Sequence, residues 1–453
     1  MALTAEQQTW IDGASRVDVA GWIYVRIKGA PFARGFQFGY LVADEWREAL
    51  RVYKYMTFQD FGMDYDFFVE HAVKMHKDKL GDELTKEMEG IAAGLTAAGQ
   101  PATIDDVIGI NAWMELTDYW WPANHEKFAK QGPKQARGTH CSAFVATGSY
   151  TADGKIVLGH TSWTDFWQGA FENVLLDITP DEGHRIVMQT GPGWVASMSD
   201  YYVMDSGLIV TETTIAGFQG YDEEKTPEYV RARLACQYGS TIDDWIQTIR
   251  KDDNGGYANS WLIGDIKTNE IARYEEGLIY TDTQKSTDGY FYGNNVPFYP
   301  PLAHLECLPV GFNDIRSASG ARRVRWEQML NQHKGAIDVE IGKTMIADTF
   351  DPYLGFNNPN SRTICSHIDA EPSANGEGVP PYMPFGSVDG KVASADDVAK
   401  VSFWGRMGRA DGVAFDAEEH FRQHPQWAWQ RGYLADRPSQ PYVYFDNGEV
   451  REQ

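Results

Sequence analysis

The sequence predicts an α+β fold in which layers of helices cover stacked layers of β-sheet. Apolar residues recur at intervals of three and four over residues 41–116, and the period changes to two from Cys141 onward. Runs of predicted strands and separate runs of predicted helices then follow one another. Such blocks favour stacked α and β layers with one sheet packed on another.

The N-terminal part is expected to be mainly helical. Residues 84–95 carry apolar side chains at helical spacing, and Thr103 is a capping residue for a further helix. Residues 122–140 are polar and have the composition of an exposed connector. We therefore expect a helical N-terminal segment over residues 1–140 and a second part over 141–453, together forming one composite domain.

The second part begins with a predicted hairpin, in which strands at 141–147 and 155–160 flank a turn at 151–154. A second hairpin, with strands at 260–266 and 271–275, flanks the turn 267–270. Further strands are predicted at 173–178, 184–189, 201–204 and 207–215, helices at 227–234 and 241–249, and long loops over 357–384.

Charge and composition exclude several classes of partner. Among the 453 residues, 64 acidic side chains exceed 40 basic ones, and this excess would repel nucleic acid. No basic segment followed by an apolar run opens the chain, and no apolar stretch approaches the roughly 20 residues that span a bilayer. We expect a cytoplasmic protein with no integral membrane segment. Assembly into a homo-oligomer stays open.

The four cysteines form no C-x-x-C pair, so the sequence predicts neither a disulfide framework nor a zinc site. Cys365 and His367 might be thought to share a metal, but two ligands are too few, and we expect no metal and no cofactor. Cys141 has two interpretations: a small buried apolar residue, or a nucleophile at the start of a strand. The polar end of the next strand, with His160 and Trp163, favours the second.

Nucleophilic chemistry at Cys141 needs a base and an oxyanion donor. If the bond between His140 and Cys141 is broken, the new α-amine, with a reference pKa of about 7.7–8.0, lies beside the thiol and can act as the base. Each oxyanion donor is typically worth about 10²–10³ in rate, and Asn259, Thr213 and its neighbour Thr214 are candidates. Arg322 and Arg323 would orient a carboxylate or the new chain end, or else form exposed ion pairs on a helix.

Several short blocks of residues follow one another along the chain: Gly138–Phe144, Gly159–Trp163, Glu212–Thr214, Tyr257–Trp261, Asn295–Tyr299, Arg322-Arg323, Ile364-Cys365 and Pro384–Lys391. In this order they resemble the blocks of phospholipase B-like proteins, and the resemblance covers residues 21–429. The N-terminal block 29–39 is also similar to the opening of penicillin-acyltransferase-like autoproteolytic enzymes.

The resemblance implies a four-layer αββα fold of the N-terminal-nucleophile hydrolases, cut between His140 and Cys141. By position, Cys141 takes the place of the nucleophile. Asn259 falls where related bile-salt hydrolases have the asparagine that donates to the oxyanion. His160 stands where those relatives have an arginine. The further site residues that the resemblance implies are Trp163, Asp165 near the α-amine, and one of Arg322 and Arg323.

The activity implied is cleavage of an amide or ester bond through a Cys141 acyl-enzyme. The substrate would be a small acylated molecule: a phospholipid, a lysophospholipid, an N-acyl amino acid or a fatty-acid amide. Two alternatives remain, a binding protein that never cleaves itself and an acyltransferase that uses an amine acceptor. The chain departs from the animal members, which have an export signal and paired cysteines after the residue that matches Ile364.

Overall fold

The computed structural model describes residues 3–128, 141–197, 199–372, 379–446 and 448–453. The chain divides into two compact units. Unit 1 comprises residues 1–132, 171–206 and 220–257, and unit 2 comprises 133–170, 207–219 and 258–453. The division therefore does not fall at Cys141, because two later segments join the N-terminal helices.

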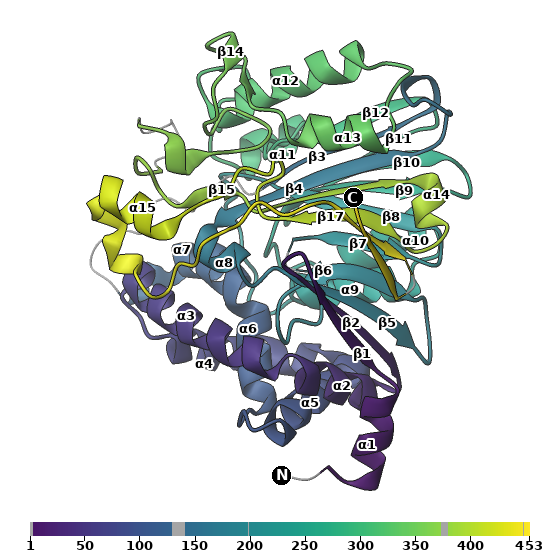
Figure 1. Ribbon diagram of the computed structural model, residues 1–453, viewed down its shortest axis with the longest axis vertical. Coiled ribbons are helices and arrows are strands. Elements are labelled where there is room, and N and C mark those ends of the chain that lie inside the picture. The colour runs from purple at the N-terminus through teal and green to yellow at the C-terminus, as the bar shows by residue number, and fades with distance from the viewer. Residues whose placement is uncertain (1–2, 129–140, 198, 373–378, 447) are drawn as a thin grey trace. The chain divides into compact units, whose positions relative to one another are not determined.

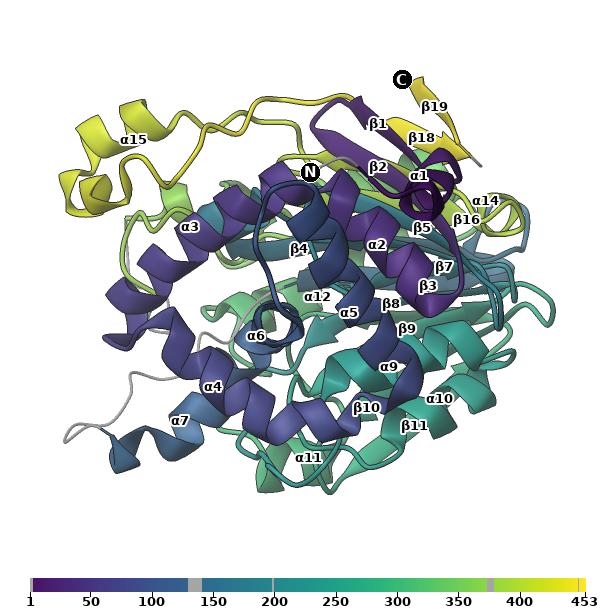
Figure 2. The ribbon, with the colours of Figure 1, turned by 90° about the horizontal axis from the view of Figure 1, so that it is seen from below.

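Unit 1 contains the helices that the N-terminal periodicity predicts, and Figure 2 shows α2 beside α5. The N-cap of α6 is Thr103, whose hydroxyl accepts from the backbone N–H of Asp106, as a capping residue should. The helices are α1 (Ala5–Asp12), α2 (Pro31–Leu41), α3 (Ala43–Phe61), α4 (Tyr65–His76), α5 (Gly81–Ala97), α6 (Ile104–Glu115), α9 (Glu228–Tyr238) and α10 (Ile242–Arg250). Among the described residues, no helix is long and apolar enough to cross a membrane.

Helices α2 and α5 touch through glycines on both sides. A Cβ placed on Gly39 would lie 2.1 Å from the carbonyl oxygen of Ile91, and one on Gly94 would lie 2.2 Å from that of Phe36. Gly35 and Gly90 meet backbone in the same way, at 2.0 and 2.2 Å. The two backbones can approach this closely only because all four positions lack a side chain.

The sheet of unit 1 runs in the order β1-β2-β5-β6-β7. Strand β2 pairs in parallel with β5, so that Ile23 lies opposite Val174 and Ile27 opposite Ile178. The sequence analysis predicted β5, β6 and β7 but not the N-terminal strands. The strands are β1 (Ser15–Val19), β2 (Trp22–Gly29), β5 (Val174–Pro180), β6 (Ile186–Thr190) and β7 (Tyr201–Met204).

The expected connector over 122–140 is wrong at its start. Helix α7 (Trp121–Asn124) and a 3₁₀ turn (His125–Lys127) occupy it, and Asn124 and His125 are buried. Aromatic packing explains the difference, because the Trp121 and Phe128 rings stack at 6.0 Å and both contact the Phe67 ring. Residues 129–140, including His140, lie outside the described residues.

In the part of the chain that the structure describes, unit 2 contains two large sheets and a small two-stranded one, in which β13 (Phe350–Asp351) pairs with β14 (Phe356–Asn357). One large sheet includes β8-β9-β10-β11 in that order, and the other runs β12-β3-β4-β16-β17-β18-β19, with β15 paired to β4. Both predicted hairpins, β3 with β4 and β9 with β10, are confirmed. The strands are β3 (Cys141–Thr147), β4 (Val157–Asp165), β8 (Leu208–Thr214), β9 (Asn259–Asp265), β10 (Glu270–Glu276), β11 (Thr281–Ser286), β12 (Gly289–Gly293), β15 (Phe385–Ser387), β16 (Asp389–Ser394), β17 (Phe403–Met407), β18 (Val443–Asp446) and β19 (Glu449–Glu452).

The two large sheets of unit 2 pack on each other, since β3 contacts β8 and β9 while β12 contacts β9 and β10. Helices α12 (Ala318–Gln332) and α13 (Val339–Ile346) cover the other face of the β3–β4 sheet (Figure 1). The core between them contains Phe144, Trp326, Ile346 and Val392, all fully buried. The predicted α+β class with stacked sheets is therefore confirmed. The short helices of this unit are α8 (Phe166–Gly169), α11 (Pro300–Leu305), α14 (Ala395–Val398) and α15 (Ala417–Gln423).

Candidate active site

Cys141 is the first residue of β3, where it lies opposite Ser162 of β4. Side chains along a strand alternate between faces, and Phe144 points into the core beneath the helices. Cys141 therefore belongs to the opposite face, together with Ser162 and with His160. Cys141 is 3% exposed, so the residue is buried within unit 2.

A buried carboxylate lies beside this thiol. The Cys141 Sγ donates to Oε1 of Glu212, on β8, across 3.8 Å. Glu212 is itself fully buried. An acidic acceptor at this place can take a proton from the thiol when the sulfur attacks a carbonyl carbon.

Arg322, on α12, holds the backbone around Cys141. Its Nη1 donates to the Cys141 carbonyl and to Oγ of Ser142, each at 2.9 Å, and its Nη2 donates to Oδ1 of Asn295 at 2.8 Å. The guanidinium is fully buried, so this fork is a rigid part of the site. The two arginine candidates differ in their contacts. Arg323 donates to the carbonyl of Phe312 and lies over the Phe312 ring.

Asn259 lies opposite a residue of the same network, on the neighbouring strand. Asn295 Nδ2 donates to the carbonyl of Thr214 at 2.7 Å, and Thr214 lies opposite Asn259 where β8 pairs with β9. Both polar atoms of the Asn259 side chain are buried, and within the described part of the chain they have no hydrogen-bond partner. A buried amide without partners costs about 1–3 kcal/mol, a cost that a bound carbonyl oxygen would offset.

Thr213, the other predicted donor, is fully buried, and its hydroxyl has no partner among the residues that the structure describes. A Cβ on Gly293 would lie 2.2 Å from this hydroxyl oxygen. Gly293 pairs with Ala143 in the β3 sheet. The hydroxyl therefore lies between the two sheets, against the strand that neighbours β3.

His160 contacts the backbone of the strand that carries Glu212. Its Nε2 lies 3.1 Å from the carbonyl oxygen of Glu212 and donates to it. Burial, together with the nearby Lys391 ammonium, holds the pKa of His160 well below its usual value. The ring is therefore a neutral donor that fixes the Glu212 backbone, while Lys391 donates to Ser162 Oγ at 2.8 Å.

Trp163 lies on the face of β4 opposite to Ser162, and so not on the face of Cys141. Its Nε1 donates to the carbonyl of Ile364 at 3.2 Å, and the Arg322 guanidinium lies 4.0 Å from its ring centre. Asp165 ends β4, is buried and lies opposite Phe385 of β15. Arg322 therefore contacts both the Trp163 ring and the Cys141 carbonyl. The position of Asp165 is set by the end of β4.

The sequence analysis assigned no role to Glu212 or Asn295. Both belong to blocks that carry the resemblance, and this was one signal available from the sequence. A second signal was the glutamate that follows the apolar run 208–210 in a predicted strand, because charged residues are rarely fully buried without a function or a partner.

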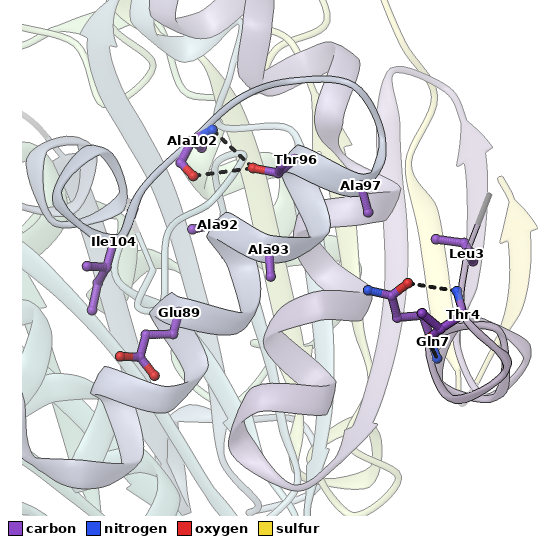
Figure 3. Close-up of a pocket in the computed structure, with 10 residues that line it drawn as sticks. All are labelled: Leu3, Thr4, Gln7, Glu89, Ala92, Ala93, Thr96, Ala97, Ala102 and Ile104. Carbon is purple, nitrogen blue, oxygen red and sulfur yellow. Dashed lines mark hydrogen bonds between the residues drawn. The ribbon is translucent and has the colours of Figure 1, made fainter. Parts of the chain in front are cut away.

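Unit 1 has a hollow of about 560 Å³ (Figure 3). Small side chains of α5, such as Ala92, Ala93 and Ala97, line it together with Leu3 and Ile104. None of the ten labelled residues is a predicted site residue. We assign no function to it.

A family model described as Phospholipase B matches residues 52–442. Phospholipase B-like protein A of Dictyostelium discoideum is 25% identical over 338 residues, which cover 65% of this chain and 56% of that protein. Phospholipase B of Crotalus adamanteus is 22% identical over 434 residues, which cover 83% of this chain and 76% of that protein. The chain spans about half the length of the first curated relatives that it matches.

Two solved structures are similar at low identity. A mutant of the conjugated bile acid hydrolase from Clostridium perfringens is 10% identical, with a TM-score of 0.36, covering 69% of this chain and 96% of that one. Penicillin V acylase from Agrobacterium tumefaciens is 11% identical, with a TM-score of 0.31, covering 60% of this chain and 76% of that one.

Proposed function

We propose, from the premise that this chain belongs to the phospholipase B family, that it is a hydrolase whose nucleophile is the Cys141 thiol. The bond cleaved is an amide or ester bond of a small acylated substrate. The thiol becomes active after the chain cuts itself between His140 and Cys141. In this proposal the active protein consists of two associated fragments.

One observation carries the proposal: the buried Cys141 thiol at the start of β3 lies beside the buried carboxyl group of Glu212, and the strand paired with that of Glu212 begins with Asn259, a buried amide that has no hydrogen-bond partner among the described residues. Cys141 has Glu212 at 3.8 Å, and the network of Arg322 and Asn295 connects it to the strand pair that holds Asn259. A cysteine that only fills a core needs none of these groups. Their convergence supports acyl transfer to sulfur.

Self-cleavage is the first step. The Cys141 sulfur attacks the carbonyl carbon of His140 while Glu212 accepts the thiol proton, and the C–N bond breaks as the nitrogen of Cys141 takes up a proton. The peptide becomes a thioester between the same two residues. Water then hydrolyses the thioester, which leaves a carboxylate on His140 and a free thiol and α-amine on Cys141.

Turnover repeats this chemistry on a substrate. The α-amine, with a reference pKa of about 7.7–8.0, takes the thiol proton as the sulfur attacks, and it passes a proton to the leaving amine or alcohol. The amide N–H of Asn259, with the hydroxyl of Thr213 or Thr214, donates to the oxyanion. Water then releases the acid from the acyl-enzyme. Arg322 keeps the Cys141 carbonyl and the strand end in place throughout.

The substrate class stays a proposal at the level of chemistry. Phospholipids and lysophospholipids offer an acyl ester, whereas N-acyl amino acids and fatty-acid amides offer an acyl amide. All four pass through the same acyl-enzyme. The choice among them rests on the leaving group that the site accepts.

The test is the mass of the denatured protein, measured for wild type and Cys141→Ala, with Cys236→Ala as the matched control. Cys236 is also fully buried, but it lies on α9 of unit 1 and takes part in none of the hydrogen bonds described for this network. We expect two fragments that meet at His140 and Cys141 in wild type and in the control, and one intact chain in Cys141→Ala. Release of acid from an acyl ester and an acyl amide should be lost in Cys141→Ala alone.

Each alternative has its own outcome. A single uncut chain in all three proteins would contradict the proposal and favour a binding protein that never processes itself. Acid release retained by Cys141→Ala would also contradict it. If an added amine captures most of the acyl group at the expense of free acid, the protein is an acyltransferase rather than a hydrolase.

A further inference from the structure

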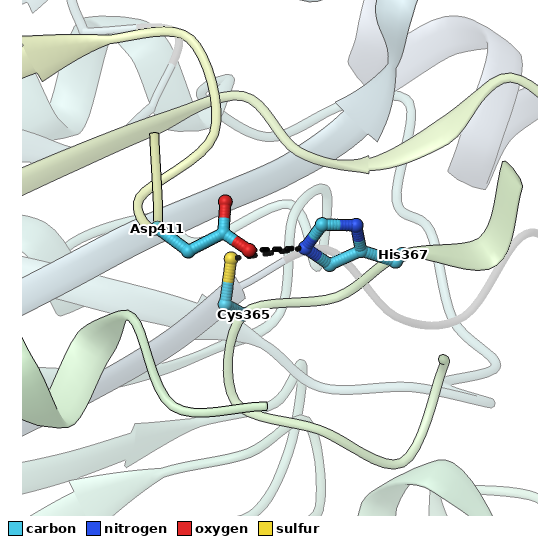
Figure 4. A group of neighbouring side chains, drawn as sticks. All are labelled: Cys365, His367 and Asp411. Carbon is cyan, nitrogen blue, oxygen red and sulfur yellow. Dashed lines mark hydrogen bonds and ion pairs between the residues drawn. The ribbon is translucent and has the colours of Figure 1, made fainter. Parts of the chain in front are cut away.

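Three potential metal ligands face one another in a second part of unit 2. The Sγ of Cys365 lies 3.6 Å from Nε2 of His367, and that nitrogen lies 2.7 Å from Oδ2 of Asp411 (Figure 4). All three ligand atoms lie within 4.8 Å of one another. Among the described residues, this is the only group of three or more such side chains that converges in this way. The sequence offered only the first two, because Asp411 is 44 residues beyond His367.

We propose that Cys365, His367 and Asp411 bind a divalent transition-metal ion, of which zinc is the best fit. Sulfur, imidazole nitrogen and carboxylate oxygen are the three ligand types that zinc accepts, in a tetrahedral arrangement. With metal–ligand lengths of about 2.0–2.3 Å, ligand atoms in a tetrahedron lie about 3.3–3.6 Å apart. The sulfur–nitrogen distance already has this value, and the nitrogen–oxygen pair must open by less than about 1 Å.

The burial of the three side chains also fits a metal. Cys365 is fully buried and His367 is 3% exposed, so both ligands are held in place by the surrounding chain. The Asp411 side chain is 14% exposed. Asp411 also lines a groove of about 670 Å³, with Ala410, Arg406, Tyr442 and Asp348. The groove gives an ion a path to the site, and it leaves room for water as the fourth ligand.

A metal here would support the strand that neighbours Cys141. Ile364, next to Cys365, accepts from Nε1 of Trp163, and the backbone N–H of Ala410, next to Asp411, donates to Oγ of Ser387. Trp163 and Ser387 lie opposite each other where β4 pairs with β15. Both ligand-bearing loops therefore contact the same pair of residues. We assign the ion a positioning role, because none of its three ligands contacts Cys141 in the structure.

The experiment uses Co²⁺ as the probe and the Cys141→Ala protein, freed of tag and stripped of metal by a chelator, so that the candidate nucleophile adds no thiolate. We expect one equivalent of Co²⁺ to produce a thiolate-to-cobalt charge-transfer band with the visible bands of a tetrahedral ion, and Zn²⁺ to displace it. Adding Cys365→Ala, His367→Gln or Asp411→Asn should abolish the band or weaken binding at least tenfold. Adding Cys236→Ala or Cys307→Ala should leave it unchanged.

Two results would overturn the proposal: a folded Cys141→Ala protein that gives no band, or a band that persists when Cys365→Ala is added. A melting temperature measured with and without Zn²⁺ covers the case in which a ligand variant folds poorly. We expect Zn²⁺ to raise the melting temperature of the Cys141→Ala protein and of its Cys236→Ala derivative. No rise in either would count against the site as firmly as a missing band.

Discussion

Two buried side chains contact Cys141, and they act on different atoms of it. Glu212 faces the sulfur, whereas Arg322 grips the carbonyl of the same residue and the hydroxyl of Ser142. The carboxylate can move a proton, and the guanidinium can only hold geometry, because it stays charged at any working pH. Substitution of Glu212 should therefore impair proton transfer, whereas substitution of Arg322 should disturb the position of the Cys141 backbone.

Arg322→Lys should lower both self-cleavage and turnover, because lysine cannot reproduce a fork that joins the Cys141 carbonyl, Ser142 and Asn295. Loss of one buried charge-assisted hydrogen bond, at about 1.5–3 kcal/mol, corresponds to roughly 10- to 100-fold in rate. Arg323→Lys is the matched control and should stay within about twofold. Rates of fragment formation and of acid release check this, and equal losses in both variants would contradict it.

Asn259→Ala should lower kcat by about 10²–10³ while KM changes little, because an oxyanion donor acts mainly in the transition state. Asn331→Ala is the control, since Asn331 is exposed on α12 and donates to the backbone of Glu327. Steady-state kinetics on one acyl ester provide the measurement. A change confined to KM would instead assign Asn259 to substrate binding.

His76, buried on α4, should make unit 1 sensitive to acid. Burial lowers the pKa of His76 to about 3, against about 6.5 in an unfolded chain. Glu115 lies 3.8 Å away, but burial raises the pKa of its carboxyl, so it is a poor counter-ion for a protonated imidazole. Below pH 6.5 the unfolded chain therefore binds a proton that the native protein does not. The free energy of unfolding consequently decreases as the pH is lowered.

The expected loss from His76 between pH 7 and pH 5 is about 2 kcal/mol. It should appear as a difference between wild type and His76→Gln when urea unfolding is measured at both pH values. The glutamine variant lacks this acid-induced loss, whereas His304→Gln, at an exposed position, should follow wild type. Parallel pH dependence in wild type and His76→Gln would show that the native histidine titrates normally.

At the scale of single elements, the sequence predicted what local pattern determines. The change of period at Cys141 identified the β3–β4 hairpin, and a capping residue identified the start of α6. Strand β2 was missed although Ile23, Val25 and Ile27 alternate with more polar residues. Its pairing with β5 joins residues about 150 positions apart, and no local pattern encodes such a partner. The helix at 121–124 was missed because long-range aromatic packing outweighs its polar composition.

Gly39→Ala should destabilise unit 1, although alanine is the better helix former by about 1 kcal/mol. Its Cβ would lie 2.1 Å from the Ile91 carbonyl oxygen, so α2 and α5 would have to separate. We expect a net loss of about 1–3 kcal/mol in urea unfolding. Ala93→Gly, on the partly exposed side of α5, is the control for the difference in helix propensity between alanine and glycine. This change should lower the free energy of unfolding by about 1 kcal/mol. A neutral or stabilising Gly39→Ala would contradict the tight contact.

At the scale of the whole chain, the predictable part of the site was the part carried by motif order. Cys141, Asn259, Thr213 and Arg322 were named from the sequence. In the structure Arg322 contacts Cys141, whereas Asn259 and Thr213 lie on the paired strands β9 and β8 of unit 2. Which arginine contacts Cys141 depended on the rotation of α12, which composition does not reveal. Asp411 stayed invisible because only folding brings it to Cys365 and His367.

If the chain cuts itself before Cys141, its two fragments should stay together without a covalent link. Strand β2 lies before the cut and β5 after it, and Glu87 of the first fragment makes buried hydrogen bonds with Arg233 of the second. We expect one peak in native size exclusion that contains both fragments, and two species only in denaturant. Cys141→Ala gives the position of the uncut chain. Separation of the fragments in native buffer would contradict this expectation.

The parallel pairing of β2 with β5 also limits how a mature form could be produced. A polypeptide begun at Cys141 would leave β5 with a bare edge, whose unpaired backbone groups are a template for joining other chains. Such a polypeptide should aggregate during synthesis even though it contains every residue of the proposed active site. Strand β2 of the N-terminal segment would then remain paired with β5 after cleavage, instead of being released with a removed propeptide. Cleavage after folding would leave no edge of β5 unpaired at any stage.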